Sequence, residues 1–571
     1  MQYHVETING LIRQTEKSND RSIKLISINC GIVFWICICL VFFSQAAFGF
    51  EQIMGHARAL SLGNAVTSDP PGIMSIHYNP AGLTQLNEGM QLSLGLTLLG
   101  TERGDSFEPD YNYEVSSPPN TSKFTAQMDT VAHTTGKAQS YQMYIPFKGP
   151  VHSLVMPLPL PLGFSYRKPN AKWVVATGTY FPFSWGSARQ DDDPGRFQGK
   201  KFYFQHMIYT SPSVGFQVLK SLSFGISIGT GQSALGLDTD IRCQHDQLAE
   251  TKERGNNIDG IPFFYGGIGP FDSIGTLNFD VRDDFSPSVN IGALFKPVSW
   301  FSFGVVYQSE IDINFKGEYQ MSYSQELLKT CQWIRQQQIL PNKWTQLGQI
   351  DKMFESGTID MDGFKIPQRI QMGVMLHPIP EFRFFFDINW TQWSVNDMIS
   401  LNFDKKLQLL KLPESLGEPA LNQTIAYQLN HKDRWNWGFG IEYIPLENMV
   451  FRVGYESKDS HVPDESWNLL SIPQTHYIGT GLGLKLKKGM TLDLALGCHF
   501  KQKDSTANNT SINLNAHNPN NLFTAPYEGQ NIEVEWRTYI AALNLTMPIE
   551  KMRIPGYDWL KSFRSKKEVE E

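Results

Sequence analysis

The 571-residue sequence predicts an all-β protein whose main domain is a 14-stranded antiparallel transmembrane β-barrel. Fourteen stretches alternate apolar residues with polar or small ones, which is the period of a strand with two different faces. They lie near 90–101, 152–167, 172–182, 201–218, 221–240, 277–296, 301–323, 358–377, 381–402, 425–444, 448–459, 474–486, 490–502 and 531–547. An even number of strands lets an antiparallel sheet close on itself, which removes the unpaired edges that lipid would penalise.

The connections between these stretches alternate in length. Six are short turns, at 168–170, 219–220, 296–299, 378–380, 445–448 and 486–489. Seven are long polar segments, at 102–151, 183–200, 241–276, 324–357, 403–424, 460–473 and 503–530. Outer-membrane barrels have this asymmetry, with short turns on the periplasmic side and long loops outside. A soluble β-sandwich shares the alternation within strands but gives no reason for the asymmetry.

The predicted strand at 425–444 shows the two faces of the wall most clearly. One face carries large apolar side chains from Trp435 to Tyr443, and the other carries Asn436, Gly440 and Glu442. A lipid-facing exterior and a polar lumen produce this pattern. Aromatic residues near strand ends suit girdles at the membrane interfaces, with core aromatics as the alternative; they are Trp300, Trp390, Trp393, Tyr443 and Trp536.

The N-terminal part carries one long apolar run, residues 25–43, preceded by Arg21 and Lys24. Small residues follow the run, which predicts a signal peptide at 1–49 that is cleaved after Gly49. Nineteen apolar residues could also span a bilayer, so an uncleaved anchor is the alternative. A barrel needs export, and the predicted location is the bacterial outer membrane.

Residues 50–88 lie between the signal and the first strand and predict a compact, poorly regular plug. Small residues recur at every second position from Gly55 to Ala65, and small residues let backbone pack closely in a confined space. Asn79-Pro80 is a turn signal, because proline fixes its own φ and keeps the preceding residue out of the helical region. An ordinary N-terminal loop is the alternative.

The same region carries a family resemblance. Gly55-His56-Ala57-Arg58-Ala59, Asn64-Ala65 and the stretch 78–83 resemble the N-terminal hatch of the FadL/TodX family, whose hatch motif is here Asn79, Pro80 and Ala81. The similarity covers about residues 50–548, and its clearest barrel stretches are 286–293, 307–317, 390–394, 435–438 and 452–455. The family contains outer-membrane transporters for long-chain fatty acids and other hydrophobic compounds. The resemblance therefore implies a hatch at 50–88 and a barrel at 89–548. Residues 549–571 depart from the family pattern, and we expect them to form a charged periplasmic extension.

The resemblance also implies where a substrate would move. The third strand of the family is kinked inward, so Gly178, Tyr180 and Pro182 form the candidate lateral opening. The alternative is that Pro182 only ends the strand. A substrate carboxylate would need a cation in the lumen, and Arg383 and Arg452 are the candidate head-group contacts because both fall on the polar face.

The remaining motifs predict no reaction chemistry. Residues 225–229 fit the G-x-S-x-G pattern, but they lie within an alternating strand, so we expect no catalytic role for Ser227. The acidic stretch 191–193 offers oxygen ligands, although an exposed acidic loop is the more ordinary interpretation. Cys243 and Cys331 fall in long loops, where we expect thiols rather than a disulfide. The sequence therefore predicts no enzyme, no cofactor and no metal site.

The predicted function is passive transport of hydrophobic molecules, above all long-chain fatty acids. Substrate would be captured by the outer loops, bind in the lumen, pass a moving hatch and leave through the wall. The alternatives are a structural or receptor barrel, an outer-membrane lipid hydrolase and a general diffusion porin. The expected partners are the hydrophobic substrate and outer-membrane lipid. We expect no nucleic-acid partner, because a net charge of −7 gives no basic surface for nucleic acid. We expect a monomer.

Overall fold

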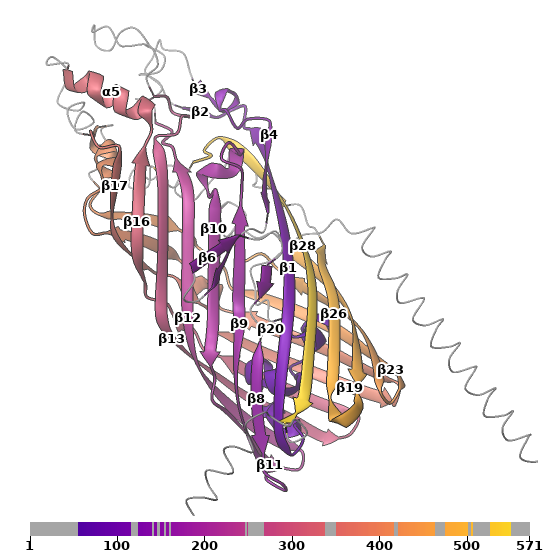
Figure 1. The fold of residues 1–571 in the computed structure, drawn as a ribbon. Helices are drawn as coiled ribbons and strands as arrows, with labels where there is room; N and C mark the ends of the chain where they lie inside the picture. Colours follow the sequence, from indigo (N-terminus) through magenta and orange to yellow (C-terminus); the bar gives the residue numbers. More distant parts are fainter. Residues whose placement is uncertain are drawn as a thin grey trace, which may run out of the picture. The chain divides into compact units, whose positions relative to one another are not determined.

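The computed structural model describes residues 55–115, 124–139, 142–145, 149–152, 156–158, 161–245, 248, 268–336, 350–415, 421–462, 474–500, 504–505, 523 and 526–549. The predicted signal peptide, the predicted C-terminal extension and most of the loop at 241–276 lie outside the described residues. The described strands form an antiparallel sheet that closes into a barrel (Figure 1).

Fourteen crossings make up the described wall, which confirms the predicted barrel. In chain order they are β1 (Gly89–Pro109); β4 (Thr134–Gln139), β7 (Met156–Leu158) and β8 (Leu162–Arg167); β9 (Trp173–Ala188); β10 (Lys201–Thr210) and β11 (Ser213–Leu219); β12 (Leu222–Ile241); β13 (Gly275–Val298); β14 (Phe301–Gln308) and β16 (Phe315–Tyr323); β17 (Phe354–Asp362) and β19 (Arg369–Ile379); β20 (Phe382–Thr391) and β21 (Met398–Phe403); β22 (Thr424–Gln428) and β23 (Arg434–Leu446); β24 (Met449–Lys458); β25 (Thr475–Lys485); β26 (Thr491–Phe500) and β27 (Asp504–Ser505); and β28 (Gln530–Pro548).

Closure joins the first and last crossings along almost their whole length. β1 pairs with β28 from Gln91 opposite Pro548 to Pro109 opposite Gln530. The six predicted short turns are present, between β8 and β9, β11 and β12, β13 and β14, β19 and β20, β23 and β24, and β25 and β26. All six lie at one end of the barrel, because each joins neighbouring antiparallel strands at the same edge.

Three small strand pairs and several short helices are not part of this wall. The pairs are β2 (Glu114–Val115) with β3 (Phe124–Thr125), β5 (Gln142–Ile145) with β6 (Gly149–His152), and β15 (Ile311–Asp312) with β18 (Lys365–Ile366). The loop helices are η3 (Ala126–Met128), η4 (Pro194–Phe197), α5 (Gln325–Gln336), η5 (Trp393–Val395), η6 (Gln408–Lys411), α7 (Leu412–Ser415) and η7 (Lys487–Gly489). No helix among the described residues is long and apolar enough to cross a membrane.

The wall has two zones of opposite polarity, and β28 shows both. Near the short turns its outward side chains are apolar, with Tyr539 and Leu543 exposed. Farther up, the outward positions are Glu533, Glu535 and Arg537, whereas the lumenal residues Ile532, Val534, Trp536 and Ile540 are buried. The lower zone therefore suits lipid, and the upper zone has a water-facing exterior around an apolar lumen.

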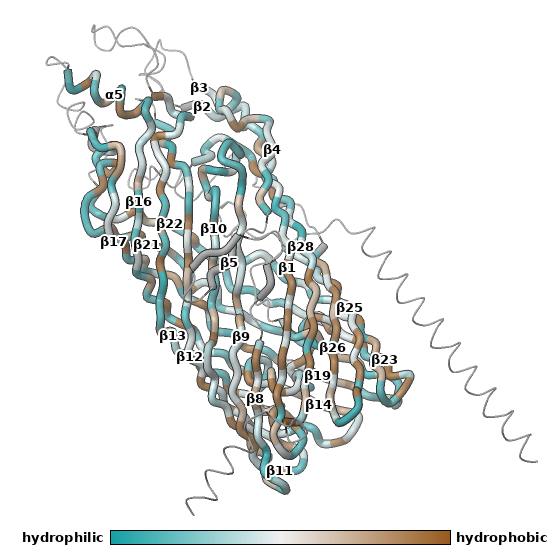
Figure 2. The backbone as a smooth tube through the Cα atoms, in the orientation of Figure 1, coloured by the Kyte–Doolittle hydropathy of each residue, from teal (hydrophilic) through white to brown (hydrophobic). Residues whose placement is uncertain are grey.

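The boundary between the zones on β13 is a β-bulge. Phe285 within it, and Ile291 and Phe295 below it, face outward and are exposed, while above it Asp280 and Arg282 occupy the outward face. The register with β12 shifts where Gly231 pairs with Ser286 but Ser233 pairs with Asp283. Figure 2 shows the same division, with hydrophobic residues concentrated in the lower strands around β8, β14, β19 and β23.

The upper zone bears on two of the sequence expectations. The first strand was expected to end near 101, but β1 continues to Pro109 and pairs there with β4, inside a stretch expected to be loop. Its outward residues are polar in this part, so the alternation runs with reversed polarity. For the aromatic residues near strand ends, girdle and core positions were the two expectations: Trp393 and Trp536 are buried toward the lumen, whereas Trp300 and Tyr443 are exposed.

Candidate functional site: the lumen and its N-terminal segment

Residues 55–88, called here the N-terminal segment, lie inside the short-turn end of the barrel, where Figure 1 draws their helices in indigo. The segment contains four short helices, α2 (Ala57–Ser61), η1 (Gly72–Met74), α3 (Ser75–Tyr78) and η2 (Pro80–Gln85). Nearly all of its residues are buried, and most of its apolar side chains form one cluster with Val174, Tyr180, Ile208 and Phe385 of the wall. The lumen of the lipid-facing zone is therefore filled by the chain's own N-terminal residues.

Asn79 holds the segment against the wall. Its side-chain amide donates hydrogen bonds to the carbonyl oxygen of Thr67 at 2.9 Å and to that of Ala293 in β13 at 3.1 Å. Its side-chain oxygen accepts from the backbone N–H of Ala81 at 3.1 Å, so Asn79 also caps η2, where Pro80 takes the first helical position. The Asn79, Pro80 and Ala81 motif is thus a helix start that is hydrogen-bonded to the barrel.

Other lumenal side chains bind the backbone of the segment in the same way. Asn290 donates to the carbonyl of Ile76 at 3.1 Å and Gln308 to that of His77 at 2.8 Å. Further contacts of this type are Ser302 to Ser68, Arg167 to Thr84 and Leu86, Thr97 to Gly55, and the N–H groups of Thr67 and Ala57 to Asp387 and Asn544. The wall therefore satisfies backbone groups that an irregular buried segment would otherwise leave unpaired.

Lumenal glycines give the segment its space. A Cβ atom at Gly225 would collide with the backbone of Pro80, and one at Gly454 with the backbone of Leu62 and Gly63. Comparable collisions with the segment would occur at Gly292, Gly304, Gly438 and Gly479. These positions lie on the small-residue face that the alternation predicted, and the close approach of another backbone is why a side chain does not fit there.

An ion-pair cluster joins the segment to the later strands. Arg58 pairs with Glu442 at 2.9 Å and with Asp69 at 2.6 Å. Arg452 pairs with the same Glu442 at 2.9 Å and with Asp493 at 2.6 Å, and Arg383 lies 3.4 Å from Glu442. Both arginines predicted to contact a substrate head group face the lumen, as expected. Each is paired with carboxylates beside the N-terminal segment.

The predicted lateral opening coincides with a bulge in β9. β10 pairs His206 with Phe183 but Ile208 with Tyr180, so β9 has one extra residue at Phe181-Pro182. The strand continues to Ala188, and the alternative in which Pro182 ends it is wrong. Before the bulge Gly178 and Tyr180 face the segment: the Tyr180 ring lies 5.2 Å from that of His77. Beyond the bulge, the burial of β9 no longer alternates.

The bulge adjoins an interruption in the described wall. On its second edge β9 pairs with β8 only up to Thr179, and among the described residues its next partner there is Gln139, opposite Ala188. A pocket at this place is lined by Tyr180 and Phe181 of β9, Pro161, Asn544 of β28, and Gly55, His56 and Met74 of the segment. β5 lies against β9 and β10.

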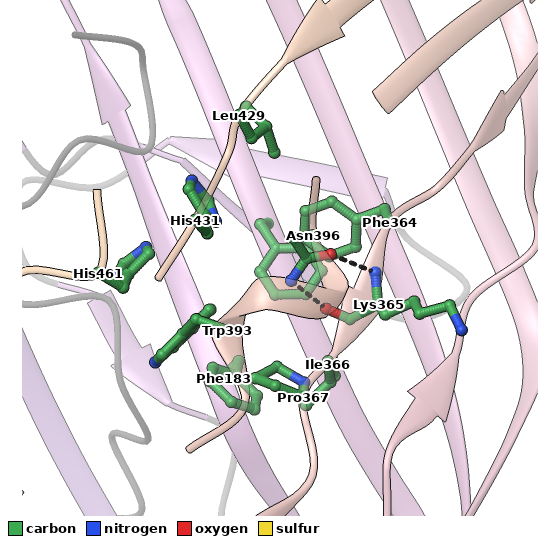
Figure 3. Close-up of a pocket in the computed structure, with 11 residues that line it drawn as sticks. Phe183, Phe364, Lys365, Ile366, Pro367, Trp393, Asn396, Leu429, His431 and His461 are labelled. Carbon is green, nitrogen blue, oxygen red and sulfur yellow. Dashed lines mark hydrogen bonds between the residues drawn. The ribbon is translucent and has the colours of Figure 1, made fainter. Parts of the chain in front are cut away.

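A second pocket lies in the apolar upper lumen (Figure 3). Its lining is mainly aromatic and aliphatic, with Phe183, Phe204, Phe364, Ile366, Pro367, Trp393 and Leu429, and its polar members are Lys365, Asn396, His431 and His461. The Phe204 ring lies 5.0 Å from Phe364, and the Trp393 ring stacks on His461 at 4.1 Å. An apolar wall with a few convergent polar groups is the usual form of a small-molecule site.

The other motifs stand apart from these features. Ser227 is a buried lumenal residue of β12, where Ser213 donates a 2.7 Å hydrogen bond to it within regular strand pairing. Asp193 caps η4 and pairs with Arg189, and no cluster of three metal-ligating residues occurs in the part of the chain that is described. Cys243 and Cys331 are both buried, without a disulfide between them. Cys331 lies on the buried face of α5 with Leu327 and Ile334.

Sequence comparison decides the family. A family profile described as "Outer membrane protein transport protein (OMPP1/FadL/TodX)" matches residues 44–547. The chain belongs to this family. Its members are outer-membrane transporters of hydrophobic compounds rather than enzymes, so the resemblance of the N-terminal segment and barrel strands is confirmed at the level of the family. No curated protein matches the chain by sequence.

Solved structures share the fold of this FadL/TodX-family chain at low sequence identity. A FadL homologue of Pseudomonas aeruginosa superposes with a TM-score of 0.62 at 14% identity, covering 88% of this chain and 100% of that one. The toluene transporter TodX of Pseudomonas putida gives a TM-score of 0.55 at 13% identity over 88% and 99% of the two chains. The toluene transporter TbuX of Ralstonia pickettii gives 0.51 at 15% identity over the same shares.

Two features of the lumen escaped sequence analysis. His431 and His461 lie in connections between strands, where the sequence has no alternation, so no periodic pattern indicated that they would meet. Glu442 was assigned only to a polar face, although it is the shared partner of three arginines. An isolated carboxylate in an otherwise small-residue lumenal face was the available signal, because a buried charge requires a partner.

Proposed function

We propose that this chain carries hydrophobic molecules passively into the outer membrane, with the N-terminal segment acting as a hatch and the β9 bulge as the side exit. The single observation that carries the proposal is the continuity of three features. The upper lumen is apolar, the segment fills the lumen below it, and beside that segment no described strand pairs with one edge of β9 between Thr179 and Ala188, next to Tyr180 and Phe181.

The proposed route follows from the two-zone wall. A molecule that enters the apolar upper lumen leaves water in the upper zone, where the exterior of the barrel is polar. Its free energy falls by about 0.8 kcal/mol for each CH₂ group that it buries. Its next favourable environment is hydrocarbon rather than periplasmic water. Exit through the wall at β9 would deliver it to the bilayer without crossing water again. A shift of the segment away from Tyr180 would open that path.

Long-chain fatty acids remain within the proposed substrate class, beside uncharged hydrophobic compounds. A fatty-acid carboxylate that reached Arg452 or Arg383 would have to compete with Glu442, which already pairs with both. We therefore propose that these two arginines chiefly secure the N-terminal segment. A head-group role would require that Glu442 be displaced during transport.

The test is uptake of labelled toluene and labelled oleate by a Gram-negative host that lacks its own fatty-acid transporter. Cells that express this chain, with the folded barrel verified in the outer membrane, should accumulate at least one of the two compounds above the empty-vector level. Absence of uptake of both compounds would contradict the proposal and favour a structural or receptor barrel. Uptake of one compound alone would identify the substrate class.

A further inference from the structure

The upper pocket contains two buried imidazoles whose hydrogen-bonding capacity is unused. His431 is 5% exposed and His461 is 3% exposed. Both ring nitrogens of His431, and Nε2 of His461, have no hydrogen-bond partner among the described residues. Buried polar groups in proteins are ordinarily paired, so an ordered water or a polar atom of a guest molecule that displaces it is the natural partner.

The two rings are fixed in place by packing. They lie 4.6 Å apart in an edge-to-face arrangement, and the His461 ring stacks on Trp393 with an interplanar angle of 15°. His431 also approaches Trp393, at 6.3 Å. Figure 3 shows both imidazoles beside Trp393 on one side of the pocket, with Phe364 and Ile366 on the other.

The remaining polar groups of the pocket are committed elsewhere. The side-chain amide of Asn396 donates to the carbonyl of Lys365 and accepts from its N–H, both at 2.9 Å. The Lys365 ammonium pairs with Glu310 at 2.6 Å and Asp312 at 2.9 Å. The imidazoles are thus the groups in this pocket lining that are placed to recognise a guest.

Both imidazoles are neutral near pH 7. His431 lies between β22 and β23, above the exposed Trp435 that begins the lipid-facing part of β23, and His461 lies in the loop after β24. Burial lowers the pKa of His431 to about 4, and burial together with His431 and Arg434 lowers the pKa of His461 well below its usual value. A neutral imidazole has one donor and one acceptor nitrogen.

We propose that His431 and His461 bind the uncharged hydroxyl group of an apolar, ring-containing substrate whose ring packs against Phe183, Phe204 and Phe364. A hydroxyl both donates and accepts, so it can use the donor of one neutral imidazole and the acceptor of the other. A carboxylate only accepts, and the pocket offers it no uncommitted cation. A hydrocarbon matches the apolar character of the lining but leaves the imidazoles unpaired. This inference rests on the proposed function, since it names a substrate class for the transport lumen.

The isosteric pair p-cresol and p-xylene tests the proposal, because the two differ by one hydroxyl in place of one methyl group. Their affinities for the purified full chain in nanodiscs are measured by equilibrium dialysis, with binding to empty nanodiscs subtracted. The double variant His431→Phe/His461→Phe should lose about tenfold in affinity for p-cresol and keep its affinity for p-xylene, because phenylalanine preserves the stacking but offers no hydrogen bond. His377→Phe, at the short-turn end of the barrel, is the matched control.

An equal loss of affinity for both compounds would overturn the proposal, since it would show that the histidines only shape the pocket. Unchanged p-cresol binding would overturn it as well. If the double variant does not insert, the single variants are measured, and each should lose part of the p-cresol affinity alone. Because binding is measured without transport, failed cellular uptake with intact selective binding would contradict the transport function and leave this pocket assignment standing.

Discussion

The side-chain amide of Asn79 donates a 3.1 Å hydrogen bond to the backbone carbonyl of Ala293, and this bond ties the N-terminal segment to β13. The same amide donates to Thr67, twelve residues earlier in the segment. One side chain thus joins two parts of the segment to one strand of the wall. This relationship makes Asn79 the residue whose removal should most directly loosen the proposed hatch.

We expect Asn79→Ala to reduce uptake of labelled toluene or oleate. The substitution removes the cap of η2 and leaves the carbonyl groups of Thr67 and Ala293 without this donor, at a cost of about 1–3 kcal/mol. Limited proteolysis of the inserted barrel should also cut the segment faster. Asn278→Ala, on the exposed outer face of β13, is the control. Equal uptake by the two variants would argue against a hatch that depends on Asn79.

Deletion of Pro182 should impair transport while leaving a folded barrel. β9 has one extra residue between Tyr180 and Phe183, so the deletion restores regular pairing with β10 and removes the bulge beside the proposed exit. Uptake should fall about tenfold relative to wild type at equal folded protein. Deletion of Asp284 removes the equivalent bulge of β13, away from the exit, and should retain uptake. If both deletions behave alike, release at β9 is not supported.

Gly454→Ala should displace the segment. The added Cβ would meet the backbone of Leu62 and Gly63, which cannot rotate away as a side-chain tip could. We expect a fall in stability of about 1–3 kcal/mol, as for overpacked cores. It is measured by electrophoresis after heating, in which the variant should lose the mobility of the folded barrel at a lower temperature than wild type. Gly100→Ala is the control, since nothing lies within 4 Å of a Cβ there. Equal stability of the two variants would show that the segment is not seated as described.

Binding of p-cresol should be independent of pH from about 8 to 5.5 and should weaken as the pH approaches 4. The folded-state pKa of His431 is lowered to about 4, so its neutral form persists far below the ordinary value of 6.5. The titratable groups in the same pocket are the neutral His461 and the paired Lys365, and Arg434 acts on His461. The unfolded chain binds the proton more readily, so the contribution of His431 to stability is full above pH 6.5 and is lost as pH falls through 4. Loss of p-cresol binding already near pH 6.5 would contradict this arrangement.

The sequence predicted the strands of the barrel wall better than the contacts inside the lumen. Alternation and turn lengths determined fourteen strands and six short turns, because lipid outside and a closed sheet leave a regular trace in sequence. The upper zone, in which outward residues such as Arg537 and Arg282 are polar and the lumenal residues are apolar, was missed. In a strand-by-strand analysis, a strand with a water-facing exterior resembles a polar loop. Asn79 was found because Asn-Pro signals a turn locally. The meeting of His431 with His461, and of Arg58 with Glu442, depends on barrel closure and on how the segment folds back, which no local pattern encodes.

The most direct test of the transport account is a reversible lock between the segment and the wall. The side-chain oxygens of Thr84 in η2 and Ser223 in β12 lie 3.0 Å apart, so cysteines at both positions come within reach of a disulfide. Uptake of labelled substrate by Thr84→Cys/Ser223→Cys cells should be lost after oxidation and recovered with reductant, while each single variant transports in both conditions. Full uptake by the oxidised double variant, with the disulfide verified, would contradict a moving N-terminal hatch.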